Sequence, residues 1–249
     1  MQAQQLSGTT ALVTGASRGF GRAIAAALSQ AGADVVGVAR DRAKLEELHA
    51  QLGDGFTPVA ADATDPVAAG ALIDTYQPRV LVLNAGAAPL SRPLQQQTWE
   101  TFSTNWHTDV KHAFNWTREA LLRPLGPGSV VIAFSSGAAV NGSPLSGGYA
   151  GSKATIRFLT GYAAAESQRA GLGIRFIAVL PQLTPATGLG SAAVAAYAAR
   201  EGMDVEAFLA TRGPALTAER VGAEITALAA DDGYDKPAYL LAAGGLSPL

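Results

Sequence analysis

Short runs of apolar residues alternate along the chain with segments in which apolar residues recur every three or four positions. The short runs are almost continuous in Val, Ile, Leu and Ala, which is typical of strands covered by helices on both faces. The pattern predicts strands at Ala11–Thr14, Asp34–Ala39, Thr57–Ala61, Val80–Asn84, Ser129–Ser135, Ile174–Leu180 and Ala238–Ala242. Because strands alternate with helices, we expect βαβ units and a mainly parallel α/β sheet.

The segments between these strands carry helix signals. Residues Arg42–Leu52 repeat leucine at helical spacing. Thr64 and Asp65 supply capping side chains just before Pro66, which suits an early helix position. Residues 184–214 fall outside the alternation, since they are rich in alanine and interrupted by proline and glycine. We expect an inserted flap there, with one or two helices.

Composition narrows the class of protein. At 249 residues, 48% hydrophobic and 15% charged, the chain can bury one large core, so we expect a single domain over residues 1–249. A net charge of -2 without a basic stripe argues against nucleic acid as a partner. The absence of cysteine and the scattered histidines (His49, His107, His112) argue against a metal site.

Targeting signals are not evident either. The first predicted strand, Ala11–Thr14, begins too close to Met1 for a signal peptide. The apolar stretches are interrupted before the roughly 18 residues that a membrane span needs. We therefore expect a cytoplasmic protein without membrane contact.

A glycine-rich stretch, TGASRGFG at residues 14–21, joins the first predicted strand to the next helix. Glycines let the backbone turn tightly and approach a pyrophosphate, whose charge the N–H groups of a helix N-terminus stabilise. An ordinary strand-to-helix turn also needs glycine, so the loop alone is weak evidence. Its place between a strand and a helix favours a nucleotide, with contacts at Gly15, Ser17, Arg18, Gly19, Phe20 and Gly21.

The second predicted strand leads into Arg40, where an NAD-selective site usually offers an acid to the ribose hydroxyls. Asp41 lies just beyond that position. Arg40 and Arg18 can together grip a 2'-phosphate, because guanidinium groups match phosphate oxygens in a charge-assisted fork. Either arginine alone is more simply a solvated surface charge, but their joint position favours NADP as the cofactor.

Tyr149 and Lys153 lie four positions apart among small residues, in GGYAGSKAT at residues 147–155. On a helix they share a face, so both can point into one cleft. An ammonium about 4 Å from a phenolate stabilises it by roughly 4 kcal/mol at an effective dielectric near 20, enough for proton exchange near neutral pH. An isolated pair of this kind is usually a surface feature. Here the preceding strand ends in Ser135 and Ser136 at a suitable distance, which favours catalysis.

The order and spacing of these motifs resemble the compact, single-domain short-chain dehydrogenase/reductases. The resemblance covers nearly the whole chain and rests on the glycine loop, Asn84-Ala85-Gly86, Ser136, Tyr149 with Lys153, Pro181 and Gly244-Gly245. Each motif is short, but their succession is specific. The resemblance implies a Rossmann-like, doubly wound sheet of about seven mainly parallel strands with helices on both faces. It also implies a homodimer or homotetramer.

The resemblance further implies a role for each motif. Tyr149 would exchange a proton with the substrate oxygen, and Ser136, rather than Ser135, would hold that oxygen. Lys153 would also grip the nicotinamide ribose, and the small residues around it would leave room for the ligands. The remaining cofactor contacts would be Asp62, near the adenine, and Ala63, Asn84, Ala85, Gly86, Pro181, Gln182 and Thr184.

One position departs from the family pattern in the catalytic set. Asp109 stands where an asparagine usually lies, and Asn105 is one turn earlier on the same face. Either can face Lys153, and the register favours Asp109. A carboxylate there would raise the lysine pKa and partly cancel its pull on the phenol. Alternatively, Asp109 turns away and the helix backbone alone carries a relay water.

A second departure is Gln182, which replaces a family glycine beside the nicotinamide. Its side chain contacts the carboxamide or the substrate, or else it turns to solvent. Thr184 or Thr187 takes the place of the threonine that usually meets the nicotinamide amide. Both alternatives stay open at the level of sequence.

By the same resemblance, the flap at residues 184–214 covers the substrate. Its larger residues carry few charges and include Leu189, Val194, Tyr197, Phe208 and Leu209. They favour an apolar or amphipathic ketone or secondary alcohol over a phosphorylated sugar. The same residues also suit the core of short helices or a subunit contact.

The expected function is an NADP-dependent oxidoreductase that moves a hydride between the nicotinamide and a ketone or secondary alcohol. A sensor or regulator that binds NADP without turnover is an alternative, although it would not need Ser136, Tyr149 and Lys153 together. An epimerase or dehydratase on the same scaffold is a third possibility, but such chains usually carry a larger substrate domain.

Overall fold

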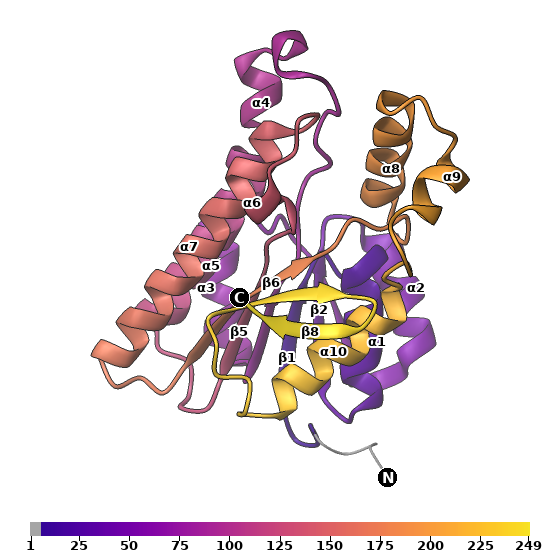
Figure 1. Ribbon diagram of the computed structural model, residues 1–249. Coiled ribbons are helices and arrows are strands. Elements are labelled where there is room, and N and C mark those ends of the chain that lie inside the picture. Colours follow the sequence, from indigo (N-terminus) through magenta and orange to yellow (C-terminus); the bar gives the residue numbers. More distant parts are fainter. Residues whose placement is uncertain (1–5) are drawn as a thin grey trace.

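The computed structural model describes residues 6–249. Its centre is an eight-stranded sheet with the strand order β3-β2-β1-β4-β5-β6-β7-β8, covered by helices (Figure 1). The strands are β1 (Thr10–Thr14), β2 (Asp34–Ala39), β3 (Phe56–Ala60), β4 (Val80–Leu83), β5 (Val130–Phe134), β6 (Arg175–Pro181), β7 (Ala238–Ala242) and β8 (Gly245–Pro248). Strands β1 to β7 are parallel, and β8 pairs antiparallel with β7. The predicted Rossmann-like α/β fold is confirmed.

The hydrophobic pattern correctly predicts seven strands, each to within one residue at either end. It misses the eighth, β8, which has only four residues and includes a glycine and a proline. Such a segment has no strand periodicity of its own. It becomes a strand because Gly245, at φ +114°, lets the chain reverse, which places Leu246 opposite Leu241.

The helices are α1 (Gly19–Gln30), α2 (Arg42–Leu52), α3 (Pro66–Tyr76), α4 (Trp99–Asn105), α5 (Lys111–Leu122), α6 (Ala138–Asn141), α7 (Gly147–Arg169), α8 (Gly188–Arg200), α9 (Val205–Ala210) and α10 (Ala218–Ala230). Two short 3-10 turns are η1 (Gly53–Gly55) and η2 (Leu94–Gln96), and a π-helical turn, η3 (Trp106–Val110), joins α4 to α5. Asp65 caps α3 by accepting from the Val67 N–H at 2.9 Å. None of the helices in residues 6–249 has the length and apolar character that crossing a membrane requires.

Alternate residues of the central strands enter two separate hydrophobic cores, one on each face of the sheet. Val13 of β1 packs with residues of α1, α2 and α10, whereas its neighbour Leu12 packs with residues of α3, α5 and α7. Val82 and Leu81 of β4 divide in the same way. Successive strand residues point to opposite faces, so a sheet covered on both sides needs apolar residues at every position.

The flap holds two helices, α8 and α9, which project beyond the sheet at the same end of the molecule as α4 and α6 (Figure 1). Val194 and Phe208 are almost completely buried and form a small core of the flap with Ala198. These two residues therefore pack the flap itself and do not line the cleft below it. Leu189, Tyr197 and Leu209 do line that cleft.

Candidate active site

A cleft of about 1310 Å³ lies at the carboxyl ends of the parallel strands and is bounded by the flap. The chain order of the strands reverses between β1 and β4, which is where doubly wound sheets bind ligands. Of the predicted site residues, all but Gly21 line this cleft. Gly21 packs beneath the loop, where a side chain would collide with the Gly15 carbonyl oxygen.

The glycine loop is fixed to the end of β4 by Thr14. The Thr14 hydroxyl donates to the Val82 carbonyl at 3.2 Å and accepts from the Asn84 and Ala85 N–H groups at 3.0 and 3.2 Å. The Asn84 side chain donates back to the Thr14 carbonyl at 3.2 Å. These bonds hold the two predicted cofactor motifs, which are 70 residues apart, on one floor of the cleft.

Helix α1 begins at Gly19 with no side-chain cap and no acidic residue in its first turn. The N–H groups of a helix start have no partner within the helix, and the helix dipole favours an anion there. Ser17 and Arg18 of the same loop line the cleft. These residues fit a pyrophosphate, and Gly15, Ser17, Arg18, Gly19 and Phe20 would hold it.

The cleft has a basic rim beyond the glycine loop, formed by Arg18, Arg40 and Lys44. Asp41 lies beside them, but its carboxylate caps α2 by accepting from the Lys44 N–H at 3.2 Å. The same carboxylate pairs with the Lys44 ammonium at 2.8 Å. The Asp41 carboxylate is therefore already bonded to the first turn of α2. Lys44 was missed from the sequence, although three basic residues within positions 40–44 were visible there.

Asp62 and Ala63 lie where β3 leads into α3 and line the same end of the cleft. Asp62 accepts from the Thr64 N–H at 2.9 Å, and this hydrogen bond lowers the pKa of its carboxyl group. The Ala63 carbonyl accepts from the indole of the buried Trp116 at 2.9 Å. The loop is thus anchored to α5 and holds a fixed position.

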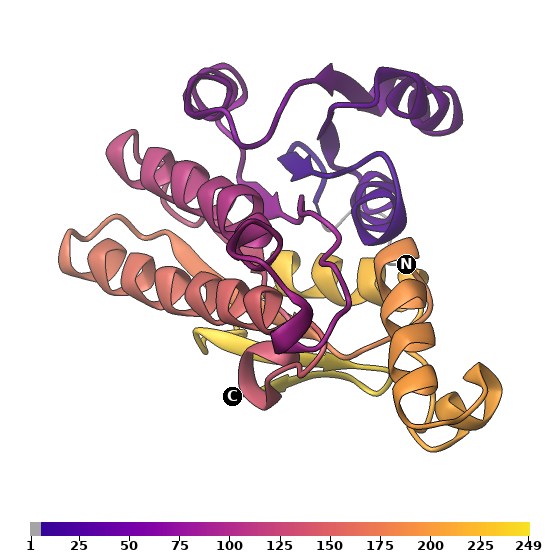
Figure 2. The same ribbon diagram turned by 90° about the horizontal axis from the view of Figure 1, so that it is seen from above.

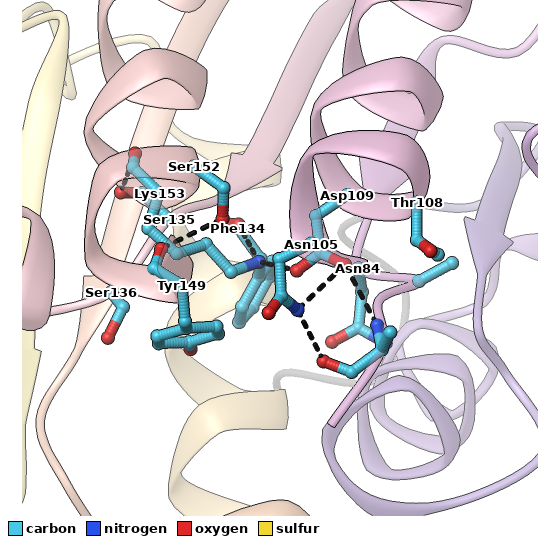
Figure 3. A network of polar contacts seen from close by, with 12 residues as sticks. Asn84, Asn105, Thr108, Asp109, Phe134, Ser135, Ser136, Tyr149, Ser152 and Lys153 are labelled. Carbon is cyan, nitrogen blue, oxygen red and sulfur yellow. Dashed lines mark hydrogen bonds and ion pairs between the residues drawn. The ribbon is translucent and has the colours of Figure 1, made fainter. Parts of the chain in front are cut away.

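Lys153 occupies the centre of the polar network (Figure 3). Its ammonium is 3.1 Å from Asp109 Oδ2, donates to the Phe134 carbonyl at 3.0 Å, and lies 5.5 Å from the centroid of the Tyr149 ring. Burial lowers the pKa of Lys153, but the Asp109 carboxylate and the Tyr149 phenol more than offset this effect. The pKa of Lys153 therefore lies above its ordinary value.

Asp109, which sits on the π-helical turn η3, reaches Lys153, whereas Asn105 does not. Asp109 Oδ1 accepts from the Ala87 N–H at 2.8 Å and from the Asn105 side chain at 3.5 Å. Asn105 also donates to the Ala87 carbonyl at 2.7 Å. The two residues thus tie the loop after β4 to the lysine. Of the alternatives open from the sequence, the structure pairs Asp109 with the ammonium.

The two serines that end β5 lie in different surroundings. Ser135 is buried and donates to the Lys153 carbonyl at 2.7 Å, so it secures the helix that carries the lysine. Ser136 is half-buried and lines the cleft, and its oxygen accepts from the Ala138 N–H at 3.2 Å. Ser136 and Tyr149 extend toward the same side of the network (Figure 3). Both serines border the cleft, but the Ser135 hydroxyl already donates to the Lys153 carbonyl, whereas the Ser136 hydroxyl donates to no group among residues 6–249 and can donate to a substrate oxygen.

The small residues beside Tyr149 serve helix packing as well as space for ligands. A side chain at Gly148 would collide with the backbone carbonyl of Phe102 on α4. A side chain at Gly151 would touch the Trp106 ring on η3. Gly148 thus lets α7 approach α4, which leads into the turn η3 that carries Asp109, whereas a Cβ atom at Gly151 would make only an ordinary contact.

His112 is a buried group near the cleft that the sequence pattern did not single out. Its Nε2 atom is buried and has no hydrogen-bond partner among residues 6–249. Burial lowers the pKa of His112 to about 4, despite the opposing effect of the Asp109 carboxylate. The ring is therefore neutral at physiological pH and packs edge-on against Trp116.

This histidine makes the stability of the fold depend on pH. Between pH 6.5 and about 4 the unfolded chain binds a proton at His112 and the folded chain does not. Stability from this group is therefore present above pH 6.5 and is lost as pH falls, by up to about 3 kcal/mol. Urea unfolding from pH 7 to 4 should show a smaller slope in His112→Gln than in wild type. The exposed His107→Gln variant is the control, and equal slopes in His112→Gln and wild type would contradict the expectation.

The start of the flap is pinned to its end. Gln182 donates to the Pro214 carbonyl at 3.1 Å, so its side chain turns toward the flap rather than into open solvent. Thr184 donates to the Leu216 carbonyl at 2.6 Å and is almost completely buried. Thr187 caps α8 by accepting from the Gly190 N–H at 3.0 Å. The Thr187 hydroxyl thus has its partner within the flap, and the Thr184 hydroxyl has its partner just beyond the end of the flap.

A parallel sheet with a glycine loop at its switch point, and a serine, a tyrosine and a lysine in the same cleft, is an arrangement typical of dinucleotide-dependent oxidoreductases. The family model described as short chain dehydrogenase matches residues 9–198. The chain belongs to this family of oxidoreductases.

Individual relatives share part of the chain. A serine 3-dehydrogenase of Agrobacterium fabrum is 35% identical over 184 residues, which cover 71% of this chain and 72% of that protein. A probable NADP-dependent dehydrogenase of Haemophilus influenzae is 34% identical over 146 residues, 57% of this chain and 55% of that protein. The match thus spans little more than half the length of the Haemophilus relative.

A solved structure supports the fold. The crystal structure of a 3-ketoacyl-(acyl-carrier-protein) reductase from Brucella melitensis, complexed with NADH, superimposes with a TM-score of 0.78. The superposition covers 96% of this chain and 98% of that chain, at 24% sequence identity.

Proposed function

We propose that this protein is an NADP-dependent oxidoreductase that transfers a hydride between the nicotinamide and a ketone or secondary alcohol, with Tyr149 as the general acid and base. The observation that carries the proposal is the position of Lys153. Its buried ammonium lies within 5.5 Å of the Tyr149 ring centroid, in a cleft that also contains Ser136 and the glycine loop. A proton donor, a hydrogen-bond donor and the expected binding site of the dinucleotide thus lie in one cleft.

Each side chain has a distinct task in this proposal. The bound dinucleotide supplies or accepts the hydride. In reduction, a C–H bond forms at the carbonyl carbon, and the C=O double bond becomes a single bond whose oxygen takes the proton of Tyr149. Ser136 donates a hydrogen bond to the same oxygen and stabilises its developing charge. Lys153 stabilises the phenolate until a proton from solvent replaces the one transferred.

Asp109 is the positioning residue of this arrangement. It holds the Lys153 ammonium at 3.1 Å and fixes the loop after β4 through the Ala87 N–H. It also neutralises part of the lysine charge, so the pull of the ammonium on the phenol is weaker than an unpaired ammonium would exert. The proton relay is thus retained in this proposal, but the effect of the Lys153 ammonium on the Tyr149 phenol is weaker.

The lining of the cleft supports the remaining cofactor contacts of this proposal. Asp62 and Ala63 would face the adenine end. Asn84, Ala85 and Gly86 would form the floor, while Pro181, Gln182 and Thr184 would lie near the nicotinamide end. All of them line the cleft. Because the Gln182 and Thr184 side chains are bonded to the Pro214 and Leu216 carbonyls, their influence on the nicotinamide would come through the backbone that they position.

Two arginines on the rim, Arg18 and Arg40, support NADP over NAD, whereas the neighbouring Lys44 is paired with Asp41. Arg40→Ser should weaken NADPH binding by about tenfold or more, because a charge-assisted hydrogen bond to the 2'-phosphate is lost. NADH binding should change little. Nicotinamide fluorescence titration measures both dissociation constants. Arg42→Ser is the matched control, since Arg42 is exposed, pairs with Glu46 and lies outside the cleft. Equal losses for NADPH and NADH would remove Arg40 from phosphate recognition.

The substrate half of the cleft supports a small amphipathic substrate. Leu183, Leu189 and Leu209 contribute apolar side chains from the flap and its start. Ser143 and Tyr197 contribute hydroxyl groups. Arg212 also lines the cleft, but its guanidinium pairs with Glu201 at 3.3 Å and stacks over the Phe208 ring. An amphipathic ketone or secondary alcohol fits this lining better than a multiply charged substrate.

The proposal is tested by mixing the purified protein with NADPH and a panel of amphipathic ketones while nicotinamide absorbance is followed. Oxidation of NADPH that depends on the ketone supports an oxidoreductase. Tight NADPH binding with no oxidation across the panel would instead favour the sensor alternative. An epimerase or dehydratase would convert its substrate without net oxidation of the cofactor.

The outer face of α5 and α7 supports a homodimer or homotetramer. These helices lie side by side (Figure 2) and expose apolar side chains at Phe114, Leu122, Phe158 and Tyr162. The Phe158 and Tyr162 rings stack at 6.4 Å. Adjacent exposed apolar groups are typical of an interface, and the same face on a second copy is self-complementary. Sedimentation equilibrium would reveal the oligomer, and a monomer at micromolar concentration would contradict it.

A further inference from the structure

Three hydroxyl groups meet in the substrate half of the cleft. Ser143 Oγ lies 2.6 Å from Ser146 Oγ and 2.5 Å from the Tyr197 phenol oxygen. Ser143 and Ser146 belong to the loop between α6 and α7, whereas Tyr197 lies on the flap helix α8. We call Ser143, Ser146 and Tyr197 the hydroxyl cluster. It joins the flap to the loop that leads to Tyr149.

Helix capping does not explain the direction of the Ser146 hydroxyl. Ser146 is the N-cap residue of α7, but its side chain makes no capping hydrogen bond. Serine at this position usually accepts from the N–H groups of the first turn. The N-cap side chains of α2, α3, α4, α8, α9 and α10 all do so. The Ser146 hydroxyl turns instead to Ser143, at the wall of the cleft.

The hydroxyl cluster is close to the reacting group. Ser146 precedes Tyr149 by three residues, and one helical turn rises about 5.4 Å. The hydroxyl cluster, Tyr149 and Ser136 all line the same cleft. A substrate that fills this part of the cleft can therefore border Tyr149 and the hydroxyl cluster together.

The chemistry of the hydroxyl cluster selects a neutral polar group. Each hydroxyl can donate one hydrogen bond and accept others, and its hydrogen rotates to suit the partner. The hydroxyl cluster carries no charge, and the nearby Arg212 is already paired with Glu201. A substrate hydroxyl can insert as both donor and acceptor, whereas an alkyl group at the same place offers neither bond.

We propose that the hydroxyl cluster is a specificity subsite for a hydroxyl group next to the reacting carbonyl. The substrates are then α-hydroxyketones in reduction, or vicinal diols in oxidation, with an apolar remainder against Leu189 and Leu209. This inference rests on the proposed oxidoreductase function. A site that hydrogen-bonds a substrate hydroxyl discriminates strongly against the analogue without it, because the polar groups of the site then lose that partner. Here the hydroxyls satisfy one another in the free protein, so the discrimination is moderate, about tenfold or more.

The test uses 2-hydroxyacetophenone and propiophenone, in which a hydroxyl and a methyl group occupy the same position. The kcat/KM ratio for the two ketones should fall by about tenfold in Tyr197→Phe and in Ser143→Ala relative to wild type. The rate with propiophenone should stay close to that of wild type. Comparing ratios between proteins cancels the intrinsic reactivity of each ketone. Two variants on different elements guard against a single folding defect.

Control variants separate recognition from general damage. Leu209→Ala should lower kcat/KM for both ketones and leave the ratio unchanged, because it alters only the apolar wall. An unchanged kcat/KM ratio in both Tyr197→Phe and Ser143→Ala would contradict the proposed subsite. The hydroxyl cluster would then serve only to hold the flap against the loop before α7. A wild-type preference for propiophenone would contradict the proposed subsite as well.

Failure of the subsite and failure of the proposed function give different results. If neither these two ketones nor any other ketone of the panel is reduced although NADPH binds, the proposed oxidoreductase function fails. The affinities of the two ketones for the NADP-loaded protein, followed by protein fluorescence, then decide the subsite independently. Tighter binding of 2-hydroxyacetophenone that is lost in Tyr197→Phe supports it, and equal binding of both ketones contradicts it.

Discussion

Tyr149→Phe is expected to lower kcat for ketone reduction by about 10²- to 10⁴-fold, because the variant loses the proton donor for the substrate oxygen. The phenylalanine ring keeps the shape of the site and the contact with the Lys153 ammonium, which lies 5.5 Å from the ring centroid. NADPH binding should therefore persist. Steady-state kinetics and fluorescence titration of NADPH measure the two quantities on the same preparation.

Tyr162→Phe is the matched control for this variant. It makes the same change on the same helix, α7, at a residue that is exposed on the outer face. Its kcat should equal that of wild type. If Tyr149→Phe kept kcat within about tenfold of wild type, general acid catalysis by Tyr149 would be refuted.

Asp109→Leu is expected to destabilise the fold by about 3–5 kcal/mol, because it leaves a buried ammonium without its counterion. The Lys153 and Asp109 side chains are only 7% and 1% exposed, so water cannot replace the lost partner. Chemical unfolding at pH 7 measures the loss. Asn105→Ala is the control, since it removes a neighbouring hydrogen bond but keeps the ion pair. A loss no larger than that of Asn105→Ala would show that the ion pair contributes little.

Asp109→Asn tests the role of the charge without changing the shape. The carboxylate raises the pKa of Lys153 against the lowering effect of burial, so its removal lowers that pKa. The ammonium also acts on the phenol more strongly once it is unpaired. Both changes should move the alkaline limb of the kcat/KM profile for reduction to lower pH, by about one unit. Overlapping profiles for wild type and Asp109→Asn would remove Asp109 from the proton relay.

The architecture was predictable because each strand carries its own signal. Leu12 and Val13 are adjacent yet enter different cores, so both faces of β1 demand an apolar residue. This requirement appears in the sequence as an unbroken apolar run. Strand β8 lacks such a run and exists only because it pairs with β7, which explains why it was missed.

The candidate site was predictable where its residues form motifs of fixed spacing. The glycine loop and the tyrosine and lysine of α7 are set by local backbone geometry, and the cleft includes them as expected. The position of Asp109 relative to Asn105 was not fixed in this way. It depends on the π-helical turn η3 and on the close approach of α7 to α4, which packing determines.

Other features depend on segments that are far apart in the sequence. Lys44 joins Arg18 and Arg40 on the rim only because α1 and α2 both start at the carboxyl ends of the paired strands β1 and β2. Tyr197 meets Ser143 across 54 residues of sequence. Gln182 turns to Pro214 because both ends of the flap converge there.

The sequence alone determined the element types, the sheet that they build and the chemistry available to the site, because periodicity and turn residues act over a few neighbouring positions. Only the tertiary structure decided which carboxylate pairs with the lysine, which charged side chains gather on the rim and which hydroxyls meet in the cleft. These choices depend on distances between segments separated by tens of residues, and only the packed core fixes such distances.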